Sequence, residues 1–193
     1  MNNQSNIEKL ISTGKTVFTI DDLAVIWEVS DRRRLVERAK YYVRQGRLKR
    51  IHKGVYGYGE YTPLEVAQKL VPLSYVSLYT AAQIHGLTFQ YYATTFSVSL
   101  KSKRYDIDKY AYEYHRVKES IFYNALGLVR QPGYTMASKE RTICDLLYVY
   151  PNTAFDNLNG LNISLLHQLA SVYENKRLER RIRQFIEALE REG

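Results

Sequence analysis

The hydrophobic period changes at Gly46, and this change constrains the fold more than any other feature of the sequence. Before it, apolar residues from Leu35 to Val43 recur with the spacing of a helix. After it, the strings RLKRI and GVYGYG read as short strands separated by a turn at Gly54. The sequence therefore predicts a helix that ends at Gly46, followed directly by a β-hairpin.

Two shorter helices are predicted ahead of this one. Apolar residues from Ile7 to Ile11 have helical spacing and stop before Gly14, and a second helix begins at the expected cap Thr19. A turn from Glu28 to Ser30 leads to the third helix, with Ser30 as its expected N-cap. Three helices followed by a basic hairpin are typical of a winged helix-turn-helix, in which the third helix enters the major groove.

The third helix and the hairpin also carry the excess charge of the chain. From Asp31 to Lys53 there are ten Lys and Arg against two acidic residues, a balance of +8, and the whole chain is also +8. The remaining segments therefore sum to neutrality, so the positive charge is local. A concentrated basic surface indicates a partner rich in phosphate, and we expect DNA binding rather than a solvated charged face.

Nine residues of this stretch are the predicted DNA contacts. Arginines on the third helix carry forked donors that pair with guanine or phosphate, whereas the cations of the hairpin suit phosphates. Tyr41 either contacts a sugar or a thymine methyl group, or packs against its own helix. The predicted recognition-helix contacts are Arg32, Arg33, Arg34, Arg38 and Tyr41, and the predicted wing contacts are Lys49, Arg50, His52 and Lys53.

The predicted domains are a winged helix-turn-helix over residues 1–60 and an α+β domain over residues 61–193. In the second domain, a helix is expected from Tyr75 to His85. Between Thr94 and Val117 the period falls to two, which predicts paired antiparallel strands in a small sheet. From Ser138 the pattern is helical again, so the overall class expected is α+β.

No catalytic residue, cofactor or metal is expected. The single cysteine, Cys144, stands in an apolar helical pattern and cannot form an internal disulfide. No pair among the four histidines has metal-ligand spacing beside a carboxylate. The N-terminus lacks the apolar core of a signal peptide, and no run of about eighteen apolar residues occurs. We therefore expect a cytoplasmic protein.

Two other functions stay open at this stage. A degenerate metal-dependent nuclease would use acids such as Asp106, Asp108 and Glu113, although the lysine that should follow the glutamate is missing. A module for single-stranded RNA would stack bases on the alternating tyrosines from Tyr110 to Tyr114. The same alternation is expected of a strand that packs one face into a core.

Six strings occur along the chain in this order: FTIDDLAVIW, RLKRIHKGVYGYG, AQKLVPLSYVSLYTAAQIHGL, TTFSVSLK, YEYHRVK and ASKERTICDLLYVYP. In order and spacing the set resembles the AbiEi family, the antitoxins of type IV toxin-antitoxin systems first known from abortive-infection defence against phages. The resemblance covers nearly the whole chain, and KGVYGYG and SYVSLYTAAQIHGL carry most of it. The last string departs from the family pattern near Ser138 and Thr142.

This resemblance implies a winged-helix N-terminal domain that binds inverted repeats in its own promoter, with two copies on the double-stranded DNA, and represses the antitoxin-toxin operon. It implies a C-terminal domain that supplies antitoxicity and helps cooperative repression. The toxin of such systems looks like a nucleotidyltransferase, and a type IV antitoxin opposes it without a stable complex. No membrane partner is implied.

Overall fold

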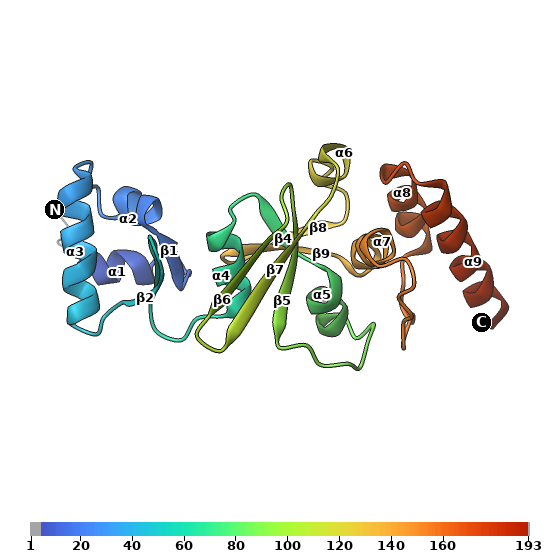
Figure 1. The fold of residues 1–193 in the computed structure, drawn as a ribbon, viewed down its shortest axis with the longest axis horizontal. Helices are drawn as coiled ribbons and strands as arrows, with labels where there is room; N and C mark the ends of the chain where they lie inside the picture. The colour runs from blue at the N-terminus through green and yellow to red at the C-terminus, as the bar shows by residue number, and fades with distance from the viewer. Residues whose placement is uncertain (1–4, 193) are drawn as a thin grey trace. The chain divides into compact units, whose positions relative to one another are not determined.

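A computed structural model describes residues 5–192, with side chains as far as Glu187. The described residues form a mixed α+β fold with nine helices, a three-stranded antiparallel sheet and a six-stranded mixed sheet (Figure 1). The predicted α+β class is therefore confirmed. The chain divides into two compact units, the first ending at Pro72 and also including Pro132–Tyr134, the second holding Leu73–Gln131 and the residues from Thr135 onward.

The first unit contains four helices and the small sheet. Its elements are α1 (Asn6–Ile11), β1 (Val17–Thr19), α2 (Ile20–Ile26), α3 (Arg32–Arg44), β2 (Lys49–His52), β3 (Val55–Gly57) and α4 (Pro63–Leu70). The strand order is β1-β3-β2, with both neighbouring pairs antiparallel. Figure 1 shows α3 along one side of this unit, with α1 and α2 beside it. The three predicted helices and the hairpin are confirmed, and β1 is an additional strand.

One face of α3 is buried in the core of this unit. Leu35 and Ala39 share a hydrophobic cluster with Leu10 of α1, Leu23 of α2 and Trp27. The Trp27 indole Nε1–H also donates to a backbone carbonyl at the start of α1, at 3.0 Å. Burial of a leucine side chain contributes about 1.5–3 kcal/mol, so this face fixes which way α3 is turned.

The N-terminus of α3 corrects the sequence prediction by one residue. Asp31 is the N-cap, and its Oδ1 accepts hydrogen bonds from the backbone amides of Arg33 and Arg34, at 2.8 and 3.1 Å. A carboxylate here serves two amides that lack helical partners and also lies at the positive end of the helix dipole. The prediction of Ser30 as the cap is wrong.

A buried carboxylate joins α4 to the start of β1. Glu65 is 6% exposed, and its carboxylate accepts hydrogen bonds from the Thr16 hydroxyl (2.7 Å), the Thr16 amide (3.0 Å) and the Val17 amide (3.2 Å). These bonds give partners to two backbone amides at the start of a strand that pairs only with β3. α4 therefore belongs to the first compact unit. The domain boundary after residue 60, as a limit of independent folding, stays a prediction.

The second unit is built on the six-stranded sheet, in the order β6-β7-β5-β4-β9-β8. Its elements are β4 (Ser74–Val76), α5 (Leu78–Ile84), β5 (Thr94–Ser99), β6 (Lys103–Ile107), β7 (Tyr110–Arg116), α6 (Glu119–Phe122), β8 (Leu128–Gln131), β9 (Tyr134–Ala137), α7 (Lys139–Val149), α8 (Ile163–Val172) and α9 (Lys176–Glu192). Side chains of α5, α7, α8 and α9 form one hydrophobic cluster with inward residues of β4 and β5. Figure 1 shows α7, α8 and α9 in succession on one side of the sheet.

Two predictions for this unit are wrong. The segment from Tyr75 to His85 holds both β4 and α5 instead of one helix, because the chain turns at Leu78, whose φ is +54°. The sheet is larger than predicted and mixed: β5 and β7 are parallel, and β6 pairs antiparallel with the other edge of β7. A period of two marks a strand without giving its direction, so the pattern could not distinguish these pairings.

A buried ion pair lies on α7 within the core of the second unit. Arg141 and Asp145 are both fully buried, with Arg141 Nε 3.6 Å from Asp145 Oδ1. Asp145 accepts hydrogen bonds from the hydroxyls of Tyr75 (3.1 Å), Ser77 (2.7 Å) and Tyr173 (2.5 Å). Burial raises the pKa of Asp145, although Arg141 and these hydroxyls act in the opposite direction. The Arg141 guanidinium also donates to the carbonyl oxygens of Ile121, Asn124 and Leu126.

Cys144 lies beside this pair and is fully buried, as expected for a small core residue. Burial raises the pKa of its thiol well above the ordinary value. None of the helices in the described range is both long enough and apolar enough to cross a membrane.

We expect Arg141→Met to destabilise the second unit by about 3–5 kcal/mol, because the substitution leaves the Asp145 carboxylate buried without its cation. Urea unfolding followed by far-UV circular dichroism measures this loss. Arg177→Met, on the exposed side of α9, is the matched control and should change stability by no more than about 0.5 kcal/mol. Equal stability of the two variants would contradict the role of the pair.

A partly buried ion pair between Asp22 of α2 and Lys69 of α4 makes the first unit sensitive to acid. Their charged atoms are 2.7 Å apart. Burial acts to raise the pKa of Asp22, but Lys69 and hydrogen bonds from Thr19 outweigh it, and the pKa is lowered. The carboxylate therefore stabilises the folded unit above pH 3.8, its ordinary pKa, and this stability is lost as the pH falls through the lower folded-state value.

Asp22→Asn should accordingly cost about 1 kcal/mol at neutral pH and progressively less as the pH falls below 3.8. Fluorescence of Trp27, the one tryptophan of the chain, follows unfolding of this unit. Asp21→Asn removes a neighbouring carboxylate whose ion pair is exposed. It should have little effect on stability, both at neutral pH and below pH 3.8. If Asp22→Asn costs as much stability below pH 3.8 as at neutral pH, the Asp22–Lys69 pair is not the source of the acid sensitivity.

Candidate nucleic-acid interface

A groove lined by cations lies between α3 and the β2–β3 hairpin of the first unit. Its volume is about 530 Å³. The apolar side chains that line it are buried or half-buried, whereas the charged ones are exposed. All five charged residues are basic: Arg32, Lys40, Arg44, Arg50 and Lys53. The remaining lining residues are Ile20, Val36, Val43, Gly54 and Tyr56.

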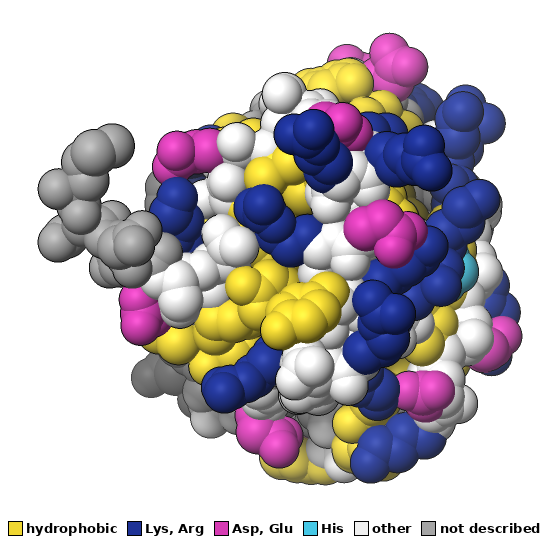
Figure 2. Space-filling model, turned by 90° about the vertical axis from the view of Figure 1, so that its left-hand side faces the viewer, with side chains coloured by type: hydrophobic (Ala, Val, Ile, Leu, Met, Phe, Trp, Pro, Cys, Tyr) yellow, Lys and Arg dark blue, Asp and Glu magenta, His cyan; other side chains and the backbone are white. Residues whose placement is uncertain are grey.

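The contribution of α3 follows from a spacing of four residues. Arg32, Val36, Lys40 and Arg44 lie at successive positions of this series. Four residues exceed one helical turn, so the stripe drifts around the helix by about 40° per step and rises about 18 Å in all. All four residues line the groove. Figure 2 shows many Lys and Arg side chains, with some acids among them, on one face of the molecule.

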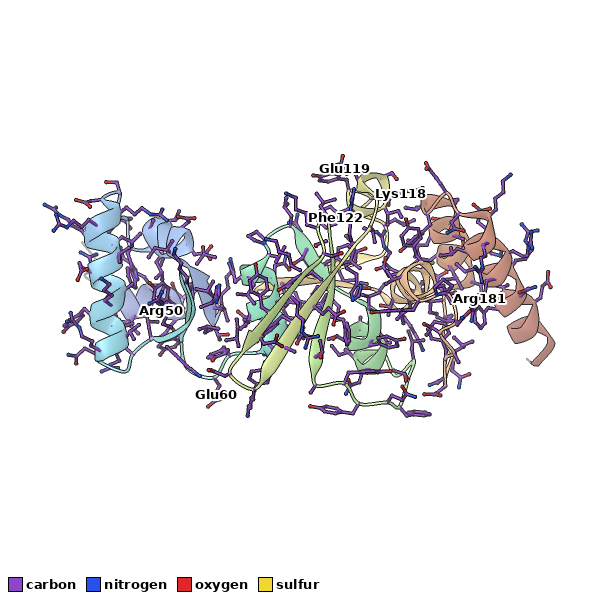
Figure 3. All side chains as sticks on the ribbon, viewed as in Figure 1. Arg50, Glu60, Lys118, Glu119, Phe122 and Arg181 are labelled. Atoms are coloured by element: carbon purple, nitrogen blue, oxygen red, sulfur yellow. The ribbon has the colours of Figure 1, made fainter. Side chains whose placement is uncertain are left out.

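The pairing of β2 and the turn at Gly54 place the two groove cations of the hairpin. Arg50 pairs with Tyr56 and lines the groove with α3 (Figure 3), whereas Ile51 is 9% exposed, and the β2–β3 register shifts between Arg50 and His52. At the turn, Gly54 has a φ of +76°, a conformation that favours glycine. Its carbonyl accepts a hydrogen bond from the Ile20 amide at 2.8 Å, which fixes the turn and with it Lys53.

Few acids neutralise these cations. Arg32 pairs with Asp21 at 3.3 Å and Lys40 pairs with Glu37 at 2.8 Å, but all four side chains are mostly exposed. Exposed pairs of this kind contribute little and exchange readily for another anion. Arg44, Arg50 and Lys53 have no ion-pair partner among residues 5–187. The groove therefore presents net positive charge to an anionic ligand.

The structure brings only part of the predicted set together. Among the residues outside the groove, Arg33 and Arg34 are exposed on the outward side of α3, and Arg34 lies 3.6 Å from its cap Asp31. Lys49 Nζ lies over the ring of Tyr61, 5.8 Å from its centroid, while His52 is exposed on β2. The predicted contacts that do line the groove are Arg32, Arg50 and Lys53.

Tyr41 and Arg38 do not line the groove. Tyr41 is half exposed, and its ring packs edge-on against that of Tyr42 at 5.4 Å. It lines a second hollow, which it shares with Ile11 of α1. Arg38 is half-buried. Packing against its own helix, one of the two interpretations of Tyr41, therefore describes its position.

Two groove residues are absent from the predicted set. Lys40 and Arg44 carry no special motif, but they continue the series that begins at Arg32. A search for cations at four-residue spacing would have found them. Their meeting with Arg50 and Lys53 depends on the position of the hairpin, which no local pattern encodes.

Four of the residues named for the other two functions, Asp106, Glu113, Tyr112 and Tyr114, are otherwise occupied. Arg104 donates to Asp106 at 3.2 and 3.3 Å and to Glu113 at 3.4 Å, so both acids belong to an ion-pair cluster. Within the described residues no three His, Cys, Asp or Glu side chains are grouped as metal ligands. Tyr112 and Tyr114 are each 1% exposed, which leaves no ring face open to a nucleic-acid base.

Comparison with models of protein families finds no match, and comparison with curated proteins finds none either. We therefore base the function on the groove and on the resemblance found in the sequence.

Proposed function

We propose that this chain is a transcriptional repressor that binds double-stranded DNA through a winged helix-turn-helix formed by its first unit. The observation that carries the proposal is the groove, where five cations and no acid lie between a helix and a hairpin. In a winged helix-turn-helix the third helix enters the major groove and the hairpin follows the DNA backbone. The chain order of α1, α2, α3 and the β2–β3 hairpin supports this assignment.

The outward side of α3 and the groove divide the work of binding. The major groove of B-DNA is about 12 Å wide and admits an α-helix, so the outward side of α3 meets base edges. Arg33 and Arg34 on that side carry forked donors suited to guanine. Arg44 and the hairpin residue Arg50 bind phosphates. These contacts orient the protein without reading sequence.

The regulatory and antitoxin parts of the proposal come from the AbiEi resemblance. Two copies of the chain bind inverted repeats in the promoter of their own operon, with half-sites about 34–36 Å apart or a multiple of this distance. The second unit supplies antitoxicity against a nucleotidyltransferase-like toxin without forming a stable complex. The protein acts in the cytoplasm and catalyses no reaction.

Binding to duplex DNA from the promoter of its own gene should weaken steeply with salt, because phosphate neutralisation releases counterions. Arg44→Ala and Arg50→Ala should each lower affinity for specific and scrambled duplexes alike, and should reduce the salt slope by about 1. Fluorescence anisotropy across a potassium chloride series measures both quantities. Arg177→Ala on α9 is the control of equal charge. A slope near zero, or an equal loss in the control, would falsify the proposal.

Antitoxicity should be separable from DNA binding. In cells that express the nucleotidyltransferase-like protein encoded beside this gene from its own inducible promoter, the wild-type chain should restore growth. The double variant Arg44→Ala/Arg50→Ala should restore it equally, because the groove lies in the first unit. Failure of the wild-type chain to rescue growth would reject the antitoxin half. Loss of rescue in the double variant at unchanged protein level would reject the division between units.

A further inference from the structure

We infer that Glu37 is a specificity-determining residue, which accepts a hydrogen bond from the exocyclic amine of a cytosine in the major groove. The inference rests on the proposed function, because it requires the outward side of α3 to face base edges. It adds a prediction about the operator: each half-site contains a C·G pair at the position that Glu37 meets.

Glu37 occupies the centre of the outward side of α3. It lies two residues from each of the buried residues Leu35 and Ala39, and at about 100° per residue it points away from both. Its side chain is 60% exposed. It is also the one acidic residue in the helix sequence RRRLVERAKYYVR. A carboxylate is thus placed where the helix projects farthest from its core.

The surrounding cations hold Glu37 in its charged form. Its Oε1 accepts a hydrogen bond from Lys40 Nζ at 2.8 Å. This bond, together with the charges of Lys40, Arg44 and Arg33, lowers the pKa of Glu37. An ionised carboxylate only accepts hydrogen bonds. Glu37 therefore offers an acceptor of fixed charge in the middle of a basic surface.

Such a group discriminates among ligands by repulsion as well as attraction. Phosphate oxygens, guanine O6 and N7, and thymine O4 are all acceptors, so they are disfavoured beside Glu37. The donors in the major groove are the amines of cytosine N4 and adenine N6, and carboxylates pair characteristically with cytosine N4. Adenine presents an acceptor, N7, beside its donor. Cytosine is therefore the base that Glu37 favours.

Helix stabilisation alone gives little reason for this position. An exposed pair three residues apart contributes little, and it contributes equally on any solvent-facing side of a helix. The other acids near α3 have local roles, since Asp31 caps the helix and Asp21 lies in the first turn of α2. Glu37 instead reduces the positive charge of the surface proposed to approach DNA. Selective recognition of a base would compensate for the weaker attraction to phosphates that this carboxylate causes.

The test is selection from a pool of randomised duplex DNA by the full-length protein and its Glu37→Ala and Glu37→Gln variants. The wild-type motif should contain a C·G pair, and Glu37→Ala should lower discrimination at that pair about tenfold. Glu37→Gln keeps the size of the side chain, and it should shift the preference toward adenine, which glutamine contacts through N6 and N7. Thermal unfolding verifies that each variant is folded.

Glu60→Ala is the control for net charge, because Glu60 is exposed beyond β3 and does not line the groove (Figure 3). If Glu37→Ala and Glu60→Ala raise affinity for all sequences equally and leave the motif unchanged, Glu37 is only a repulsive charge and the inference fails. It also fails if Glu37→Ala matches Lys40→Ala in lowering affinity uniformly. In both cases the proposed function survives. If the wild-type chain binds no duplex, the proposed function and the inference fail together.

Discussion

The anchoring of α3 by Leu35 and Ala39 is the constraint on which the rest of the first unit depends. A helix that carries so many cations gains little stability from its exposed residues, which repel one another. The buried face supplies the stability instead, through contacts with α1, α2 and Trp27. Because that face is held, every other side chain of α3 has a defined direction. The groove and the exposed outward side of α3 are two consequences of one packing interaction.

The positions of charged residues add to what packing determines in the first unit. Asp31 sits at the N-terminus of α3, where a negative charge stabilises the helix without facing the groove. The hairpin brings Arg50 and Lys53 opposite the helix through the pairing of β2 with β3 and a glycine turn. Like charges at this density are tolerated in a small unit because they remain solvated. Under the proposed function, Arg44, Arg50 and Lys53 gain phosphate partners when DNA is bound.

The sequence predicted those helices and turns that are determined by nearby residues alone. Glycines and hydrophobic period located α1, α2, α3 and the hairpin, since each follows from its own residues. The cap was missed by one residue because Ser30 and Asp31 are both good caps and only the path of the chain selects between them. Strand direction in the large sheet was missed because alternation carries no information on polarity. The break at Leu78 depends on a backbone conformation that leucine seldom adopts.

The candidate site likewise has features that nearby residues determine and features that tertiary structure determines. Three of the predicted contacts, Arg32, Arg50 and Lys53, line the groove, and their role in DNA binding stays a prediction. Which cations converge depends on the rotation of α3 and the position of the hairpin. These are tertiary quantities, so Lys40 and Arg44 were left out and Tyr41 was placed with them.

The carboxylate of Glu65 has a consequence for how this protein can be divided. A fragment cut at residue 60, the predicted end of the winged helix-turn-helix, would lose α4 and with it the acceptor for the Thr16 and Val17 amides. The start of β1 would then be a bare strand edge, a surface that invites pairing with another chain. Self-association of such a fragment would reflect the cut and not the biology of the intact protein. The smallest faithful piece of the first unit extends through Leu70.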